Sequence, residues 1–202
     1  MKRKILITTI VIALLSLTSV FANDTFYKKG DQKVTFNVGP SVPDFILFFS
    51  KTGSTHPKYF YPGLEVLKIG GYGGVNFDFF YNEKNSLGVE VGYNFNYDNG
   101  KILYSNVPIS AIYTYTPIQN GTWDLSLSAG LGISFNTRDG QTLTSLITPL
   151  KANASYFFNE NWGIGLTTGI YAAYNINYRS DLSNDNGIIA YSPVTLSLTF
   201  RN

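Results

Sequence analysis

The residues that could carry out chemistry are few, and the single histidine is the first to consider. The chain has 202 residues with one histidine and no cysteine. His56 follows Ser54 and Thr55 in a stretch that we predict to be a loop. A serine nucleophile needs a base within hydrogen-bond reach and an acid that orients the base, and no acidic residue stands at a spacing that indicates such a set. We interpret His56 as a solvated loop residue and predict no catalytic residues, with a rim-active lipid-modifying enzyme as the least favoured alternative.

Metal and phosphate chemistry have equally little support in the sequence. One histidine and no cysteine leave only carboxylates as metal ligands, so we predict no metal site and no cofactor. The stretch Gly70 to Gly74, read as GGYGG, has the glycine content of a phosphate-binding loop. No helix follows it, however, so the helix N-terminus that would hold the phosphate is missing. We predict that these glycines belong to a strand.

The remaining candidates are charged residues on the polar faces of predicted strands. They are Lys68, Asp78, Glu90, Asp124 and Lys151. If the turn after the second strand centres on Lys84, Asp78 lies opposite Glu90, and two like charges in a poorly hydrated space need a cation beside them. We predict that Lys151 supplies this cation. The favoured interpretation is a structural network that holds a barrel shut, and the alternative is a polar path through the barrel.

Strands with a repeat of two residues would position these charges. Between Trp123 and Asn136, large apolar residues alternate with Asp, Ser, Gly and Asn, and the same alternation runs from Leu87 to Tyr97. This period predicts strands with one apolar and one polar face. We predict eight of them, at residues 33–48, 64–81, 87–97, 103–116, 123–136, 146–158, 162–178 and 188–200. Residues 44–49, which read DFILFF, do not alternate, so a continued first strand and a short loop helix both stay open.

The composition of the two faces indicates which one meets water. The polar face consists mostly of Gly, Ser, Thr and Asn, whereas soluble surfaces carry many Lys and Glu. Charged residues make up 14% of the chain, against about 25% in ordinary globular domains. The strands are also long enough to cross a bilayer. We therefore predict an all-β, eight-stranded antiparallel up-and-down transmembrane β-barrel with its apolar face turned to lipid, and a secreted soluble barrel is the alternative.

Aromatic residues mark both ends of the apolar face, as in the interfacial girdles of membrane barrels. At the end with short turns the predicted girdle comprises Phe79, Tyr81, Tyr113, Tyr115, Trp123, Tyr156, Phe158, Trp162 and Phe200. At the opposite end it comprises Phe95, Tyr97, Phe135, Tyr174 and Tyr178. Two aromatic bands around an aliphatic belt indicate that the chain spans a membrane.

The N-terminus predicts export. Residues 1–22 contain a basic start, an apolar run and a cleavage site with Val20 and Ala22 before the break, which together indicate a cleaved signal peptide. We predict a short periplasmic leader at 23–32 and an outer-membrane barrel domain at 33–202. Removal of Lys2, Arg3 and Lys4 with the signal reduces 15 basic residues to 12, against 13 acidic ones. We find no basic patch and predict no nucleic-acid partner.

The strand layout, both girdles and the motifs GVEVGYNF and NENWGIGL resemble the small eight-stranded outer-membrane barrels, such as the OmpX and OmpW types. This resemblance covers residues 33–202. It implies an integral barrel in the outer membrane of a bacterium with two membranes. We predict a monomeric, non-enzymatic scaffold, with outer-membrane lipid and the barrel-assembly machinery as partners. Displayed surface loops would bind a surface partner, extracellular ligand or small solute. The alternative that it implies is a narrow channel or small-molecule conduit of the OmpW type. Such barrels usually end in an aromatic residue, whereas here Arg201 and Asn202 follow Phe200.

Overall fold

The computed structural model describes residues 26–50, 58–99, 101–138, 140–175 and 186–202. The predicted signal peptide, His56 and Tyr178 lie outside these residues. The described elements are β1 Gln32–Phe48, β2 Phe60–Pro62, α2 Gly63–Val66, β3 Gly70–Phe80, β4 Asn85–Tyr97, β5 Leu103–Gln119, β6 Trp123–Arg138, β7 Gln141–Phe157, β8 Trp162–Asn175 and β9 Gly187–Arg201. No helix among the described residues is long and apolar enough to cross a membrane.

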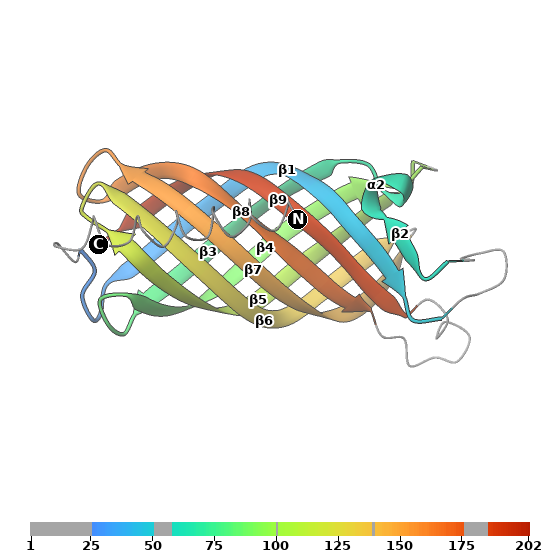
Figure 1. Cartoon of the computed structure of the whole chain (residues 1–202), viewed down its shortest axis with the longest axis horizontal. Helices are drawn as coiled ribbons and strands as arrows, with labels where there is room; N and C mark the ends of the chain where they lie inside the picture. Colours follow the sequence, from blue (N-terminus) through green and yellow to red (C-terminus); the bar gives the residue numbers. More distant parts are fainter. Residues whose placement is uncertain (1–25, 51–57, 100, 139, 176–185) are drawn as a thin grey trace, which may run out of the picture.

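The long strands form a closed antiparallel barrel (Figure 1). Each strand from β3 to β8 pairs with the next along the chain, and β1 pairs with both β3 and β9, so the eight long strands close on themselves. Lys33 pairs with Arg201, which places the start of β1 and the end of the chain at the same end of the barrel. This end also carries the short turns between β3 and β4, β5 and β6, and β7 and β8. The predicted eight-stranded antiparallel barrel is confirmed.

The largest difference from the predicted strands is in the second one. The predicted second strand at 64–81 is shortened to β3, and the residues before it form β2 and α2. Ser41 of β1 pairs with Gly70, and Phe45 pairs with Pro62. The three residues 42–44 between these pairs on β1 therefore lie opposite the seven residues 63–69 of the neighbouring segment. The four extra residues leave the ladder as the single turn of α2. Gly63 begins this turn against β1, because a Cβ there would lie 2.3 Å from the carbonyl oxygen of Pro43.

β1 continues as a strand to Phe48, so the open question about residues 44–49 is answered in favour of the strand. Its missing alternation has a local cause. A β-bulge lies between Pro43 and Phe45 in the pairing with β9, with Asp44 as the extra residue. One extra residue shifts the side chains that follow by one position, which breaks a pattern of period two.

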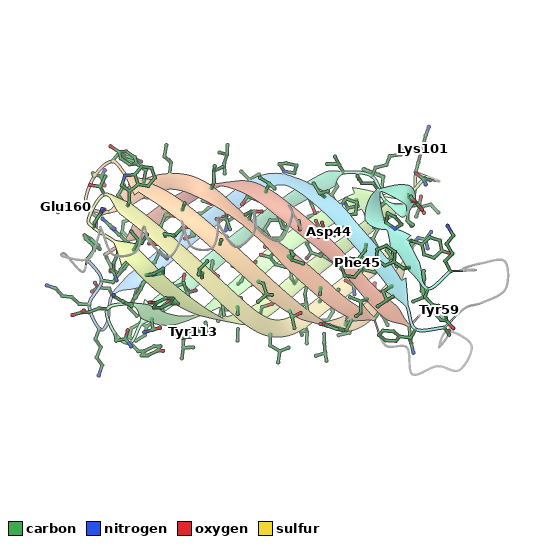
Figure 2. All side chains as sticks on the ribbon, viewed as in Figure 1. Asp44, Phe45, Tyr59, Lys101, Tyr113 and Glu160 are labelled. Atoms are coloured by element: carbon green, nitrogen blue, oxygen red, sulfur yellow. The ribbon has the colours of Figure 1, made fainter. Side chains whose placement is uncertain are left out.

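Burial alternates along the strands in the sense opposite to that of a soluble protein. Leu196 of β9 is 68% exposed, whereas its neighbour Ser197 is 4% exposed. The same contrast separates Leu131 from Ser134 on β6, and large apolar side chains project from the outer wall in Figure 2. The structure therefore places the polar face inside and the apolar face outside, as lipid requires.

The outward aromatic residues gather at the two ends of this apolar surface. At the short-turn end, Trp123 lies 5.2 Å from Tyr156 and Trp162 lies 5.0 Å from Phe200, measured between ring centroids. At the other end, Phe95 lies between Tyr93 and Tyr97 with centroid separations of 6.2 and 6.4 Å. Tyr93 belongs to this outer cluster, although the sequence analysis did not include it.

Candidate functional site

The interior of the barrel holds the charged residues, and the layer nearest the short turns is the basal plug, defined as Tyr27, Lys33, Phe80, Asp124 and Arg201. Lys33 Nζ donates hydrogen bonds to Asp124 Oδ2 at 3.2 Å and to Ser126 Oγ at 3.0 Å. Tyr27 Oη donates to the same Asp124 oxygen at 2.6 Å. All members of the plug are buried, so Asp124 is neutralised inside the barrel by Lys33.

Aromatic rings complete the basal plug. Tyr27 stacks on Phe80 with ring centroids 3.9 Å apart. The Arg201 guanidinium carbon lies 3.3 Å from the centroid of Phe26 and 3.5 Å from that of Phe157. The charged residue that follows the last outward aromatic therefore turns into the barrel and closes its end.

Tyr27 belongs to the predicted leader, and the sequence analysis did not anticipate that it enters the barrel. Its backbone N–H donates to Gln119 Oε1 at 2.8 Å. Burial, followed by the charge of Asp124, raises the pKa of the Tyr27 phenol well above its usual 10.0. The signal in the sequence was the aromatic pair Phe26-Tyr27 within an otherwise polar segment.

A second layer lies deeper along the barrel, and we call it the Glu90 cluster: Glu90, Lys151, Tyr72 and Tyr171. Lys151 Nζ forms an ion pair with Glu90 Oε2. Tyr72 Oη donates to Glu90 Oε1 at 2.6 Å, and Tyr171 Oη donates to the same oxygen. The Lys151 and Glu90 side chains are only 6% and 2% exposed. The carboxylate therefore has one cation and two phenol donors in place of water.

The glycines of GGYGG make room for this cluster. A Cβ on Gly74 would lie 2.7 Å from Tyr72 Oη, and a Cβ on Gly92 of the neighbouring strand would lie 2.6 Å from the same atom. Any larger residue would push Tyr72 away from Glu90. Tyr171 is held from the other side, because it stacks on Tyr191 with centroids 5.2 Å apart. The glycine-rich stretch is thus a strand, as predicted, and its role is steric.

The predicted opposition of Asp78 and Glu90 is wrong. Asp78 pairs with Gly88, and Asn76 pairs with Glu90. The turn centres on residue 83 rather than on Lys84, because Asn82 Oδ1 accepts hydrogen bonds from the backbone N–H of Lys84 at 3.0 Å and of Asn85 at 2.9 Å. A shift of one residue in the turn moves the opposing residue by two.

Asp78 has its own neutral partners on three strands. Its carboxylate accepts hydrogen bonds from Asn76 Nδ2 at 2.5 Å, Thr114 Oγ1 at 3.1 Å and Ser86 Oγ at 3.3 Å. Lys151 Nζ is near this group as well, because it lies 3.4 Å from Asn76 Oδ1. Asn76 therefore links the Asp78 carboxylate to the Glu90 cluster.

Lys68 is not an interior residue, which corrects the sequence analysis. It lies in the connection between α2 and β3, and its side chain is exposed. The reason is the helical turn of α2, which removes this segment from the strand that the alternation predicted. Lys33 takes the interior position instead, and the series Lys33, Thr35 and Asn37 on one face of β1 was the signal that could have revealed it.

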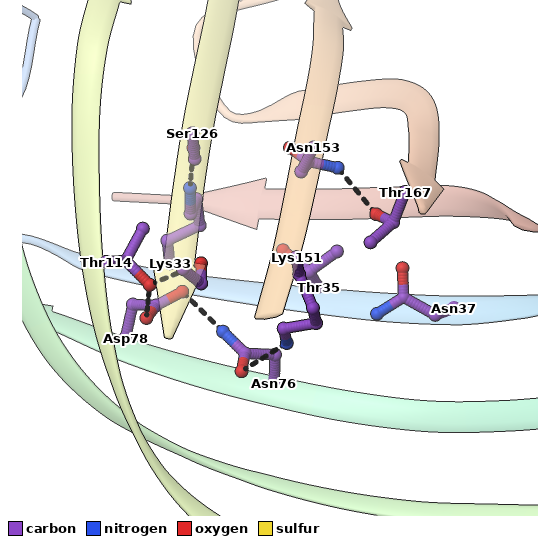
Figure 3. A pocket seen from close by; sticks show the side chains of 11 residues that line it. Lys33, Thr35, Asn37, Asn76, Asp78, Thr114, Ser126, Lys151, Asn153 and Thr167 are labelled. Atoms are coloured by element: carbon purple, nitrogen blue, oxygen red, sulfur yellow. Dashed lines mark hydrogen bonds between the residues drawn. The ribbon is translucent and has the colours of Figure 1, made fainter. Parts of the chain in front are cut away.

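Two small cavities lie beside these layers. One measures about 20 Å³ and is lined by residues including Lys33, Asp78 and Lys151, as Figure 3 shows. The other measures about 10 Å³ beside Tyr72 and Tyr171. One water molecule needs roughly 10–15 Å³, so each cavity has room for about one water. Ile46, Leu67 and Tyr104 pack together towards the outer end.

The described interior residues are arranged for charge pairing and steric closure. Among the described residues, no group of three or more His, Cys, Asp and Glu side chains could hold a metal ion. At the outer rim, Arg138 forms an ion pair with Asp98 at 2.8 Å. His56, the residue considered for catalysis, lies outside the described residues.

Comparisons with known proteins agree with this architecture. A protein-family model matches residues 18–200 of the chain. An uncharacterized protein of Treponema pallidum (strain Nichols) is 30% identical over 100 residues, which cover 48% of this chain and 45% of that protein. The chain therefore spans less than half the length of this relative.

Two solved structures share the fold. The crystal structure of Neisserial surface protein A (NspA) matches with a TM-score of 0.53 and 13% identity, over 84% of this chain and 94% of that one. The outer membrane protein OprG from Pseudomonas aeruginosa matches with a TM-score of 0.50 and 13% identity, over 89% of this chain and 99% of that one. The chain belongs to the family whose model spans residues 18–200, and its fold is that of the small eight-stranded outer-membrane β-barrels.

Proposed function

We propose that the protein is a non-enzymatic, non-conducting scaffold that anchors its outer connections in the outer membrane and presents them at the cell surface. The observation that carries this proposal is the filled interior. The basal plug and the Glu90 cluster occupy successive levels, and the cavity between them measures only about 20 Å³. An eight-stranded barrel is just wide enough for its own side chains, and here large polar side chains occupy that width.

Buried ion pairs oppose any rearrangement that would open the lumen. A continuous path would require Lys151 to leave Glu90 and Lys33 to leave Asp124, and both pairs are buried. Leaving one buried charge without its partner costs about 3–5 kcal/mol. Since 1.4 kcal/mol corresponds to a factor of ten, one such step alone reduces an open population by at least about a hundredfold.

The proposal extends to the surroundings of the barrel. The exposed apolar wall would contact outer-membrane lipid, the predicted signal at residues 1–22 would direct export, and the barrel-assembly machinery would insert the chain as a monomer. The outer connections would bind a surface partner or a small extracellular ligand. The support for these statements is the closed barrel with its apolar outer wall, which suits a position in lipid.

Solute flux across vesicles tests the proposal. Purified protein is reconstituted into vesicles, and swelling is followed after dilution into iso-osmotic solutions of small sugars or amino acids. We expect the swelling rate of protein-free vesicles. Swelling that depends on solute size would overturn the scaffold proposal and favour the narrow conduit. Insertion is verified in the same samples by the different gel mobility of unboiled and boiled protein.

A further inference from the structure

The outer wall carries an apolar groove that the interior network does not explain. It is an open hollow of about 640 Å³ that crosses β5, β6, β7, β8 and β9. Residues along its walls are Tyr113, Tyr115, Leu127, Ala129, Leu150, Ala152, Thr168, Ile170 and Ser192. Nearly all of these side chains are outward-facing residues of the membrane-spanning strands, so the groove opens towards lipid.

Strand register explains the shape of the groove. Its floor is the ladder row in which Ser128 pairs with Lys151 and Lys151 pairs with Gly169. The Lys151 side chain points into the barrel, and Gly169 has none, so the backbone of this row is uncovered on the outside. Ala152 and Thr168 flank the row on one side. Small side chains therefore stand where the surrounding wall has leucine and isoleucine.

The groove runs obliquely through the apolar band. It begins at Tyr113, which lies towards the short-turn end in Figure 2, and reaches Ser192 on β9. Crossing five strands corresponds to four strand spacings, or about 19 Å. Because strands in such barrels tilt by roughly 40°, a path across them also climbs along the barrel axis. An elongated hollow of this length within the lipid-facing band fits one acyl chain.

One end of the groove carries polar groups and a cation. The carbonyl oxygen of Lys84 accepts a hydrogen bond from the backbone N–H of Thr116 at 2.8 Å, which fixes Lys84 beside the end of β5. The Lys84 side chain is exposed. Tyr113 Oη donates to Asn85 Oδ1 at 2.5 Å in the same place. Asn85 also pairs with Tyr115, so Asn85 and the exposed Lys84 next to it in the chain adjoin the short-turn end of the groove, just outside its lining residues.

We propose that this groove is a binding site for one phospholipid, with an acyl chain along the row Ser128, Lys151 and Gly169 and the anionic headgroup beside Lys84. An amphiphile with one negative end matches an apolar groove with one positive end. A second copy of the barrel would offer a convex wall, which contacts only the rims of a groove. Ala152 and Thr168 set the depth of the site, and Lys84 sets its preference for an anionic headgroup.

Native mass spectrometry of the refolded full chain, in micelles doped with phosphatidylglycerol, tests the proposal. We expect one retained phosphatidylglycerol per barrel for the wild type, and loss of it in Ala152→Leu/Thr168→Leu, which fills the groove. Ala111→Leu is the matched control, because it enlarges an outward alanine on β5 outside the lining residues, and it should retain the lipid. Lys84→Ala should lower retention of phosphatidylglycerol at least several-fold, while leaving retention of uncharged diacylglycerol unchanged.

The same experiment can overturn the proposal. Equal retention by the wild type and the filled variant would exclude the groove as the site. A wild-type dimer that dissociates in the filled variant would assign the groove to a second copy instead. Each variant is first shown to fold by its gel mobility before and after boiling, so a misfolded sample cannot pass as loss of binding.

Discussion

Replacement of Lys151 by alanine probes the interior network most sharply. The change leaves the Glu90 carboxylate buried without its cation, at 2% side-chain exposure. Removing one partner of a buried ion pair costs about 3–5 kcal/mol. The phenols of Tyr72 and Tyr171 still donate to Glu90, and hydrogen bonds to a charged group contribute about 1.5–3 kcal/mol each. We therefore expect the lower end of the range, a loss of about 3 kcal/mol.

The assay is urea unfolding of wild type and variants refolded in the same detergent. A slope of about 1–3 kcal/mol per molar urea turns this loss into a midpoint lowered by about 1–3 M. Lys68→Ala is the control, because Lys68 is an exposed lysine, and surface substitutions usually change stability by less than about 0.5 kcal/mol.

A second variant separates charge from packing. Lys151→Met/Glu90→Gln removes both charges and keeps similar volumes, and replacement of a whole buried pair is often neutral. We expect it to regain most of the stability that Lys151→Ala loses. An unchanged midpoint in Lys151→Ala would refute the reasoning, because it would mean that water already screens Glu90.

Three further predictions concern the wall, the leader and the glycines. Trp123 and Trp162 should emit at short wavelength in vesicles and be quenched better by shallow than by deep acyl-chain labels, and complete quenching by aqueous iodide would contradict their outward placement. The raised pKa of Tyr27 means that its docking is fully stabilising below the unfolded-state pKa of about 10 and weakens as the pH rises towards the folded-state pKa. Stability should therefore fall as the pH rises above about 10, and the fall should be shallower in Tyr27→Phe, because one buried phenol fewer loses its proton. Equal pH dependence of the two urea midpoints would argue against docking. Gly92→Val should displace Tyr72, which NMR would detect as a changed environment of the Tyr72 ring, and should lower the free energy of unfolding by about 1–3 kcal/mol. Gly121→Val is the control. Its Cβ would meet open space, although the φ of +74° is unfavourable for valine, and it should leave the Tyr72 ring environment unchanged.

Alternation along each strand predicted the barrel well, because apolar residues mark the face towards lipid and polar residues mark the face towards the interior. Trp123 to Asn136 needed no information beyond its own sequence to be assigned a lipid face and an interior face. The long strands also follow from period two alone. The prediction was incomplete where the ladder is irregular, because the bulge at Asp44 and the turn of α2 depend on contact between two segments, at Pro43 and Gly63. The bulge is visible in the sequence only as broken alternation at residues 44–49, and the turn of α2 leaves no local pattern.

The interior network was predicted less completely, for a related reason. Polar alternation places a residue inside, but its partners depend on the strand register. The hydrogen bonds that Asn82 accepts in one turn set a register in which Asp78 lies opposite Gly88 instead of Glu90. Lys151 was assigned as the cation from strand positions across the barrel, and the structure places it against Glu90. Tyr27 and Arg201 lie beyond the predicted strand ends, where alternation carries no information about direction.

Single-channel recording in planar bilayers tests the closed interior most directly. Wild-type protein inserted at low concentration should give no discrete conductance steps at moderate voltage, because Lys151 with Glu90 and Lys33 with Asp124 fill the lumen at two levels. Lys151→Ala, recorded as a comparison, retains the basal plug and should also stay closed. Regular current steps from the wild type, with cation selectivity that Glu90→Gln alters, would contradict the account and establish a water-filled conduit.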